Sequence, residues 1–382
     1  MDLEEFLRKK QTSIEQVLAS ANEEGQLVEE DTLIVVGSLS EGLATLKSDM
    51  DLILVTDRDP KSISKNGSIA WVNGKCLVDM EIVHRAAVQE LVTRFKGWIQ
   101  GGWGKTFAAN FSSEERKLLH RYLKGIYLDD SDNKKQNQIV KYDEIELSRL
   151  KLHCARHTAR SIQVDVVGHK QRQDYRSITY AAIELLGHAI DALLASHYIT
   201  NPMAKWRSRL LESLPDIGLS ELDQRFKSKN ADDIVWHLHK IPEHTPQAIL
   251  EQAHEIFTFC RWVFLYAEIK LVHPHVFKFF KVITNFPLPN SDNIGYSTLP
   301  LLEFDVDFHI NDDEIFMARL NEFDEVLSLS STELSLVMQF NGKTHEEEAL
   351  SNVFQKKIGV EERNTLNKLL KAFDQTGLLA KD

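Results

Sequence analysis

The sequence predicts a soluble protein with an N-terminal α/β sheet domain, a central helical bundle and a small C-terminal domain. Three observations predict this plan. Short β-branched runs alternate with helix-like segments in residues 1–98, and apolar residues recur at helical spacing in residues 99–288. Residues 289–382 combine a strand hairpin with three further helical segments. At roughly 100–200 residues per domain, a chain of 382 residues is long enough for these three domains.

Composition and charge restrict the partners. The formal net charge is −12 at pH 7. Such a surface repels phosphate backbones and anionic membranes, so we expect neither nucleic acid nor a membrane as partner. The three cysteines, which lack close spacing, are typical of buried, reduced thiols. The charged N-terminal segment has no apolar core, and the most apolar run, residues 256–269, is too short and too polar to span a bilayer. We therefore expect a cytoplasmic protein.

Four short runs predict the strands of the N-terminal domain. Residues 33–36 and 52–55 are β-branched or leucine-rich. Residues 69–72 and 76–83 flank an Asn-Gly pair, which suits a tight hairpin turn.

The strongest chemical signal begins where the first of these runs ends. Gly37-Ser38 is followed, after ten residues, by Asp49-Met50-Asp51. The missing side chain of Gly37 lets backbone N–H groups approach an anion, and Ser38 adds a hydroxyl donor. We expect a helix to start at Ser38 and to direct its positive end at the same place. A phosphate group is the expected occupant.

Asp49 and Asp51 are two residues apart at the start of a strand, so their carboxylates share one face. Two neighbouring carboxylates repel each other unless a cation holds them, and Mg²⁺ or Mn²⁺ takes such oxygen ligands while keeping positions for phosphate and water. Gly-Ser and two aspartates also occur together by chance in loops. Here the strand run, the gap, the entry into a second strand and an acidic strand downstream coincide, which favours a site.

The acidic strand downstream is the run around Asp79 and Glu81. We expect these two carboxylates to share a face, opposite the apolar Leu77, Met80 and Ile82. Either acid is a candidate for the third carboxylate of a metal site.

The stretch GSLSEGLATLKSDMDLILV, residues 37–55, resembles the nucleotidyltransferase superfamily, in particular its minimal and antibiotic-modifying branch. The resemblance implies a polymerase-beta-like α/β sheet domain. It also implies metal-dependent transfer of a nucleoside monophosphate, AMP from ATP being the expected case, with release of pyrophosphate. In that scheme Asp49, Asp51 and Asp79 bind the metals, and Asp79 or Glu81 is the third acid and the base toward the acceptor.

The resemblance also assigns nucleotide-binding residues. Gly37, Ser38 and Ser48 would contact the nucleotide. A basic residue of the helical domain reaches the triphosphate in related enzymes, and Lys205 is the candidate here; the alternative is an exposed lysine beside a packed Trp206. Asp174, Tyr175 and Tyr180 either line an acceptor pocket or cap and pack helices.

The C-terminal region follows a predicted linker at residues 286–293. Runs at 315–318 and 326–329 predict a hairpin, and Ser330 or Ser331 can cap the helix after it. Further helices are expected at 345–355 and 361–376, with Gly377 as a left-handed cap and a short terminal strand. This order of elements predicts a small winged-helix domain.

The segments LSLSSTELSLVMQFNGKTHEEEALSNVF and NKLLKAFDQTGLL resemble the PqqD-like winged helix, which recognises leader peptides in ribosomal-peptide modification. The resemblance implies that a peptide adds as a strand at a sheet edge near Phe316 and Val326, with Leu366, Leu369 and Leu370 behind it. A winged helix used for packing or dimerisation is the alternative.

The sequence therefore predicts a nucleotidyltransferase that modifies a hydroxyl or similar group of a small molecule or a peptide. The alternative is a protein of the same fold that acts as an antitoxin-like or regulatory binding partner of another protein. The acceptor, the preferred NTP and the oligomeric state do not follow from the sequence.

Overall fold

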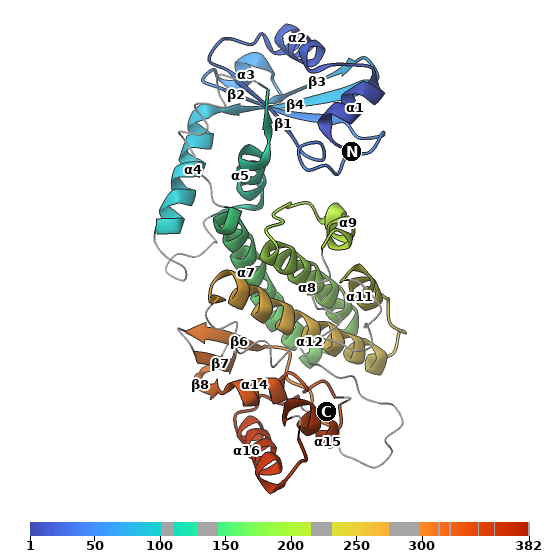
Figure 1. Ribbon diagram of the computed structural model, residues 1–382, viewed down its shortest axis with the longest axis vertical. Helices are drawn as coiled ribbons and strands as arrows, with labels where there is room; N and C mark the ends of the chain where they lie inside the picture. Colours follow the sequence, from blue (N-terminus) through green and yellow to red (C-terminus); the bar gives the residue numbers. More distant parts are fainter. Residues whose placement is uncertain are drawn as a thin grey trace. The chain divides into compact units, whose positions relative to one another are not determined.

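The computed structural model describes residues 1–100, 111–128, 144–214, 231–274, 298–311, 314–320, 322–342, 344–354 and 356–380. The chain divides into two compact units, Met1–Leu147 and Ser148–Asp382 (Figure 1). The predicted linker at 286–293 and the predicted boundary at residue 288 lie outside the described residues. The predicted boundary at residue 98 stays a prediction, since the first compact unit extends beyond it to Leu147.

The first unit contains these elements: α1 (Leu3–Lys10), α2 (Ile14–Gly25), β1 (Thr32–Val36), β2 (Met50–Thr56), α3 (Pro60–Ile63), β3 (Ser68–Asn73), β4 (Cys76–His84), α4 (Arg85–Gln100), α5 (Ser113–Lys124) and β5 (Ile126–Tyr127). Within the described ranges, the five strands form one sheet in the order β3-β4-β2-β1-β5. β2 and β4 are parallel, and the other neighbours are antiparallel. The mixed α/β class and all four predicted strands are confirmed, including the hairpin of β3 and β4 around Asn73-Gly74.

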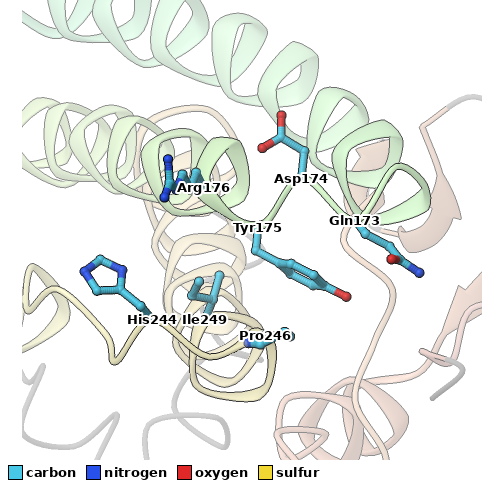
Figure 2. A pocket seen from close by; sticks show the side chains of 7 residues that line it. All are labelled: Gln173, Asp174, Tyr175, Arg176, His244, Pro246 and Ile249. Atoms are coloured by element: carbon cyan, nitrogen blue, oxygen red, sulfur yellow. The ribbon is translucent and has the colours of Figure 1, made fainter.

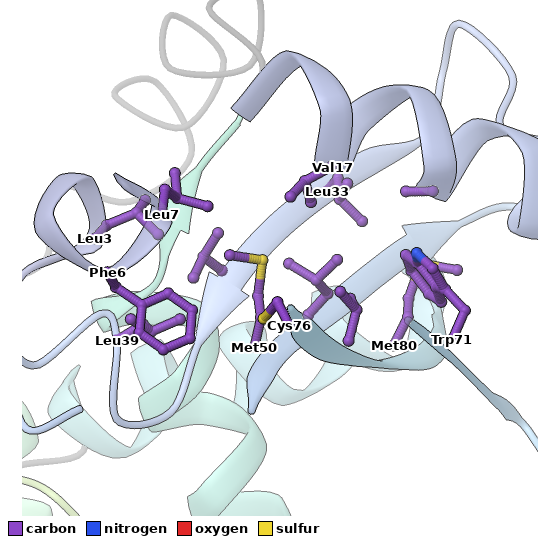
Figure 3. Packing of buried hydrophobic residues seen from close by; sticks show 14 of the residues in the cluster. Leu3, Phe6, Leu7, Val17, Leu33, Leu39, Met50, Trp71, Cys76 and Met80 are labelled. Atoms are coloured by element: carbon purple, nitrogen blue, oxygen red, sulfur yellow. The ribbon is translucent and has the colours of Figure 1, made fainter. Parts of the chain in front are cut away.

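One face of this sheet is a hydrophobic core under α1 and α2 (Figure 3). The alternation of side chains explains it, because every second residue of a strand points to the same face. Met50, Leu52 and Leu54 of β2 lie on the core face, together with the buried residues of the neighbouring strands. Ser13 caps α2 with a capping box, which fixes the start of the helix that covers this core.

The opposite face of the sheet carries the alternate side chains of each strand. α4 contacts β2 and β4, and α5 contacts β1. Ile34 and Ile53 on this face are completely buried. Gly125, between α5 and β5, is required for the close packing, because a Cβ there would collide with Ile34 and with the backbone. α4 and α5 therefore cover one part of this face, at the rows occupied by Ile34 and Ile53.

The second unit contains the rest of α7 (Glu144–Gln171), which starts before the unit boundary, and these further elements: α8 (Tyr175–Ser196), a 3₁₀ turn η2 (Ala204–Trp206), α9 (Arg207–Glu212), α11 (Ala231–Leu238), α12 (Pro246–Leu271), β6 (Val306–Asn311), β7 (Glu314–Arg319), β8 (Glu322–Leu329), α14 (Ser331–Val337), α15 (Glu346–Phe354) and α16 (Val360–Gln375). α8 and α12 pack along each other. The predicted helical character of the central region, residues 99–288, is confirmed for its described residues except β5, which belongs to the sheet of the first unit.

α8 is, among the described residues, the one helix long and apolar enough to cross a membrane. In its apolar window 61% is buried inside the protein, as in the core helix of a soluble protein. The three cysteines, Cys76, Cys154 and Cys260, are free and buried, as the sequence predicts.

The C-terminal strands form a three-stranded antiparallel sheet, within the described residues, in the order β6-β7-β8. The hairpin of β7 and β8 is confirmed, and so are the capping box at Ser330 and the left-handed Gly377. β6 was not predicted. The expectation of a sheet edge near Phe316 is wrong, because Phe316 lies in the central strand, between His309 of β6 and Ser328 of β8. Val326 does lie on an edge strand of this sheet.

Candidate active site

The predicted helix after Gly37 is absent, and residues 37–42 form turns instead. Gly37 and Gly42 both have left-handed backbone angles, with φ of +73° and +70°, which an α-helix does not accept. The turn is closed by the Leu43 N–H, which donates to the Ser38 carbonyl at 2.8 Å. Burial of Leu39, Leu43 and Ala44 anchors the segment in place of helical hydrogen bonds. Any phosphate contact here therefore depends on turn N–H groups and hydroxyls, without a helix dipole.

Gly37 lies directly against the carboxylate of Asp51. A Cβ on Gly37 would collide with Oδ2 of Asp51 and would lie 3.2 Å from its Cγ. The side chain of Ser40 donates a hydrogen bond to the Gly37 carbonyl at 3.1 Å and holds the turn. From the sequence, a glycine is expected at position 37 because its missing side chain lets backbone N–H groups approach an anion. The structure gives two more specific reasons, which are the positive φ and the space that the aspartate occupies.

The register of the parallel strands decides which acid lies next to Asp51. Asp51 of β2 is paired directly with Asp79 of β4, while Glu81 is paired with Ile53, one row further along. Paired residues of parallel strands point to the same face, so the carboxylates of Asp51 and Asp79 are neighbours on the face opposite the apolar core. Glu81 instead accepts a hydrogen bond from Nη1 of Arg121 at 2.8 Å. The structure therefore brings Asp79, rather than Glu81, beside Asp51.

Asp49 lies one residue before β2 and is exposed. Burial raises the pKa of the nearby Cys76 thiol. The charge of Lys10 lowers this pKa, and the charge of Asp49 raises it. In the part of the chain that the structure describes, no three side chains of the types His, Cys, Asp and Glu are grouped closely enough to hold a metal ion. The sheet thus supplies two adjacent carboxylates, Asp51 and Asp79, with Asp49 at the entrance to the strand.

One expectation about β4 is wrong. Leu77 was expected on the apolar side with Met80 and Ile82, but it is 46% exposed and shares the face of Asp79 and Glu81. The residues that alternate into the core are Cys76, Val78, Met80 and Ile82. The reason is the two-residue period of a strand, which puts odd and even positions on opposite faces.

α5 holds the site from two sides through consecutive residues. His120 Nε2 lies 3.0 Å from Oε1 of Glu41 in the turn after Gly37, and both side chains are largely buried. Arg121, the next residue, contacts Glu81 on β4. Sequence reasoning did not identify Glu41, His120 or Arg121. Glu41 lies within the motif and could have been noticed, but nothing in the sequence near α5 indicates that it contacts the motif.

The predicted nucleotide-binding residues fall in two units. Ser38 is half-buried in the turn after β1. The Ser48 hydroxyl accepts a hydrogen bond from the Thr45 N–H at 2.9 Å and so holds the loop that leads to Asp49. Lys205 belongs to the second unit, where it is exposed and its Nζ lies 5.3 Å from the ring centre of Trp206. Its contact with a nucleotide stays a prediction.

A pocket of about 570 Å³ lies in the second unit, where the first turns of α8 and α12 come together (Figure 2). Its lining residues are Gln173, Asp174, Tyr175, Arg176, His244, Pro246 and Ile249. Asp174 also caps α8, because its carboxylate accepts hydrogen bonds from the N–H and the hydroxyl of Ser177. Asp174 therefore caps a helix and also lines this pocket, and the binding of an acceptor in the pocket stays a prediction. Tyr180 does not line this pocket and is 78% exposed.

Comparison of the chain with models of known protein families gives no match, and comparison with curated proteins gives none either. Any functional assignment therefore depends on the motif and on the geometry of the sheet.

Proposed function

We propose that the protein is a metal-dependent nucleotidyltransferase of the polymerase-beta-like fold, with a helical part and a C-terminal winged helix. It transfers a nucleoside monophosphate, AMP from ATP in the expected case, to a hydroxyl of a small molecule or peptide and releases pyrophosphate. One observation carries the proposal. Asp51 and Asp79 are cross-strand neighbours, and Gly37 leaves the space that the Asp51 carboxylate fills.

The donor set fits Mg²⁺ or Mn²⁺. Both ions prefer carboxylate oxygens and keep positions for phosphate oxygens and water. Asp51 and Asp79 would hold the metal, and Asp49, just before β2, is the further ligand that the motif predicts. The fit is supported by the glycine at position 37, since any larger residue would displace the Asp51 carboxylate. When bound, the metal neutralises the charge that develops on the phosphate during transfer.

The residues of the chain then have separate tasks. The turn at Gly37 and Ser38 binds the triphosphate through N–H and hydroxyl donors. Asp79 accepts the proton of the acceptor hydroxyl, whose oxygen attacks the α-phosphorus while the bond to the β-phosphate breaks. The ion pair of Glu81 with Arg121 and the hydrogen bond between Glu41 and His120 keep β4 and the turn in position.

The acceptor class follows from the charge of the protein. A net charge of −12 disfavours a nucleic-acid acceptor and suits a cytoplasmic enzyme that acts on a neutral or cationic molecule. In the PqqD-like interpretation, β8 would be the strand that accepts a peptide, because it is an edge strand of the small sheet.

The test is pyrophosphate release with each of the four NTPs and Mg²⁺ or Mn²⁺. The acceptors are pooled aminoglycosides, lincosamides and short peptides. We expect release that depends on one acceptor and that disappears in Asp51→Asn. Asp57→Asn is the matched control, because Asp57 follows the far end of the same strand and is 65% exposed at its side chain. The control should keep the wild-type rate.

Two outcomes would favour another function. Equal release by wild type and Asp51→Asn would contradict the site. Absence of both release and NTP binding, together with a protein that co-purifies tightly, would favour the antitoxin-like or regulatory binding function.

A further inference from the structure

The hairpin of β3 and β4 presents an uncovered apolar surface beside the acids. Val72 is 71% exposed and Leu77 is 46% exposed, and the two are paired across the hairpin. Ala70, also exposed, is paired with Asp79. We refer to Ala70, Val72 and Leu77 as the hairpin patch.

The sheet register aligns this patch with the acid site. One row across the sheet runs from Asp51 through Asp79 to Ala70, and the adjoining row of the hairpin holds Leu77 and Val72. Neighbouring strands are about 4.8 Å apart, so the Cα of Ala70 lies about 10 Å from that of Asp51. The patch is therefore within the reach of one small molecule that also contacts Asp79.

The two sides of the Asp51–Asp79 pair are not equivalent. The Gly37 turn lies on the β1 side of Asp51, since Val36, the last residue of β1, is paired with Asp51. The hairpin patch lies on the other side, beyond Asp79. In phosphoryl transfer the attacking oxygen and the leaving oxygen lie roughly in line on opposite sides of the phosphorus. A triphosphate held at the Gly37 turn therefore leaves the hairpin side to the acceptor.

The charge and the apolar side chains of this face indicate which class of acceptor it can bind. Besides the three patch residues, this face of the hairpin carries Ser68, Asp79 and Glu81. Glu81 is paired with Arg121 of α5, which leaves the negative charge of Asp79 beside the patch. An anionic acceptor is disfavoured by this charge. Exposed Val and Leu gain free energy when an apolar group covers them, and a carboxylate next to them can receive the proton of a hydroxyl.

We propose that the hairpin patch is the acceptor subsite and that it binds an uncharged or cationic small molecule with an apolar substituent near the reacting hydroxyl. The inference rests on the proposed function, because the side of approach follows from transfer at Asp51 and Asp79. It adds the acceptor class, which the motif alone does not indicate.

The experiment is a titration followed by the NMR signals of isotope-labelled Val and Leu methyl groups. The probes are methyl and hexyl β-D-glucoside, which share their hydroxyls and differ in apolar length. Mg²⁺ and α,β-methylene-ATP are present throughout. We expect the Val72 and Leu77 signals to shift with hexyl glucoside, and the Kd to fall about fourfold for each methylene that reaches the patch. Val28, an exposed valine of the loop before β1, should not shift.

The double variant Val72→Ser/Leu77→Ser should abolish the preference for the hexyl probe, and Val28→Ser should retain it. Both variants change exposed residues, so the fold should persist. Absence of shifts at Val72 and Leu77, or equal affinity for both glucosides, would overturn the inference. Signals that broaden with protein concentration alone would overturn it too, since the patch would then be a self-association face.

The titration separates this inference from the proposed function. If pyrophosphate release depends on Asp51 but the patch does not respond to the probes, only the acceptor subsite is wrong. If the patch binds hexyl glucoside as expected and no acceptor gives release, the transferase function is wrong and the patch is a ligand site of another kind.

Discussion

Two groups of charged residues, one in each unit, surround their aspartates in opposite ways. In the first unit, Asp51 and Asp79 lie side by side on a sheet face, so two like charges are neighbours. In the second unit, Asp307 of β6 is buried between Arg156 and Arg160 of α7, at 3.3 Å and 2.8 Å. Asp51 and Asp79 thus each have a like charge beside them, whereas Asp307 has opposite charges beside it.

The buried cluster of the second unit also includes α12. Arg156 contacts Glu268 at 2.6 Å, and Arg261 donates to the Val306 carbonyl at 2.9 Å. Burial opposes the ionisation of Asp307, but the charges of Arg156 and Arg160 outweigh it and hold its pKa well below the usual range. Buried charges that are paired in this way connect α7, α12 and β6.

The two groups of aspartates differ in what the loss of one carboxylate does to the stability of the fold. Removing a carboxylate from the paired cluster leaves a buried cation without compensation, which is costly to stability. Removing a carboxylate from the like-charged pair relieves repulsion and leaves the fold intact. Like-charged carboxylates that lie side by side on a sheet face are the ones expected to bind a cation.

The largest expected effect tests the like-charged pair. Asp79→Asn should lower the rate of nucleotidyl transfer by about 10²-fold or more, because a general base typically contributes that much. The thermal midpoint should stay at the wild-type value or rise. Steady-state pyrophosphate release and a thermal melt measure the two quantities. A rate close to wild type would exclude Asp79 as the base.

The next effect concerns the buried cluster. Asp307→Ala should reduce the free energy of unfolding by about 3 kcal/mol, as expected for a buried charge that loses its partner. Urea unfolding of the full chain measures it, with Asp165→Ala on the exposed side of α7 as the control. A loss of unfolding free energy no greater than that of the control would show that the cluster does not stabilise the fold.

The same carboxylate predicts a pH dependence. The pKa of Asp307 is lowered in the folded state, so its contribution to the free energy of unfolding is complete above the ordinary aspartate pKa of about 3.9. The contribution is lost as the pH falls below that value toward the folded pKa. Between pH 4 and pH 2 the wild type should therefore lose stability more steeply than Asp307→Ala. Parallel curves of unfolding free energy against pH would contradict this.

A smaller effect tests the contact between Gly37 and Asp51. Gly37→Ala and Gly42→Ala impose the same left-handed strain of about 1–2 kcal/mol, but a Cβ at Gly42 meets nothing within 4 Å. Only Gly37→Ala should displace the carboxylate, and it should lower transfer about tenfold more than Gly42→Ala. Comparison of kcat/KM for ATP in the two variants measures the difference, and equal values would refute the contact.

The smallest expected effect concerns the other acid. Glu81→Gln should change transfer less than about threefold, because Glu81 pairs with Arg121 and lies one row beyond Asp79. The loss in stability should be below about 1 kcal/mol for this partly exposed pair. A drop as large as that of Asp79→Asn would make Glu81 the third acid and would exclude the assignment by register.

Local patterns in the sequence determined β1 to β4, the hairpin of β7 and β8, the cap at Ser330 and the motif from Gly37 to Asp51. These features depend on residues within a few positions of one another, so turn chemistry and side-chain alternation are sufficient to predict them. The helix after Gly37 failed because burial of Leu39 and Leu43 and the left-handed Gly42 outweighed helix formation. β6 was missed because the charge of Asp307 makes its sequence resemble an exposed polar segment. Only the folded structure shows that Arg156 and Arg160 neutralise this charge.

Tertiary structure alone decided that Asp79, and not Glu81, is the neighbour of Asp51. It also decided that His120 and Arg121 contact the turn and β4. The physical reason is that strand register and helix packing pair residues far apart in the sequence. The packing of side chains in the core fixes the register of the strands. That register in turn decides which residues are neighbours on the opposite face of the sheet.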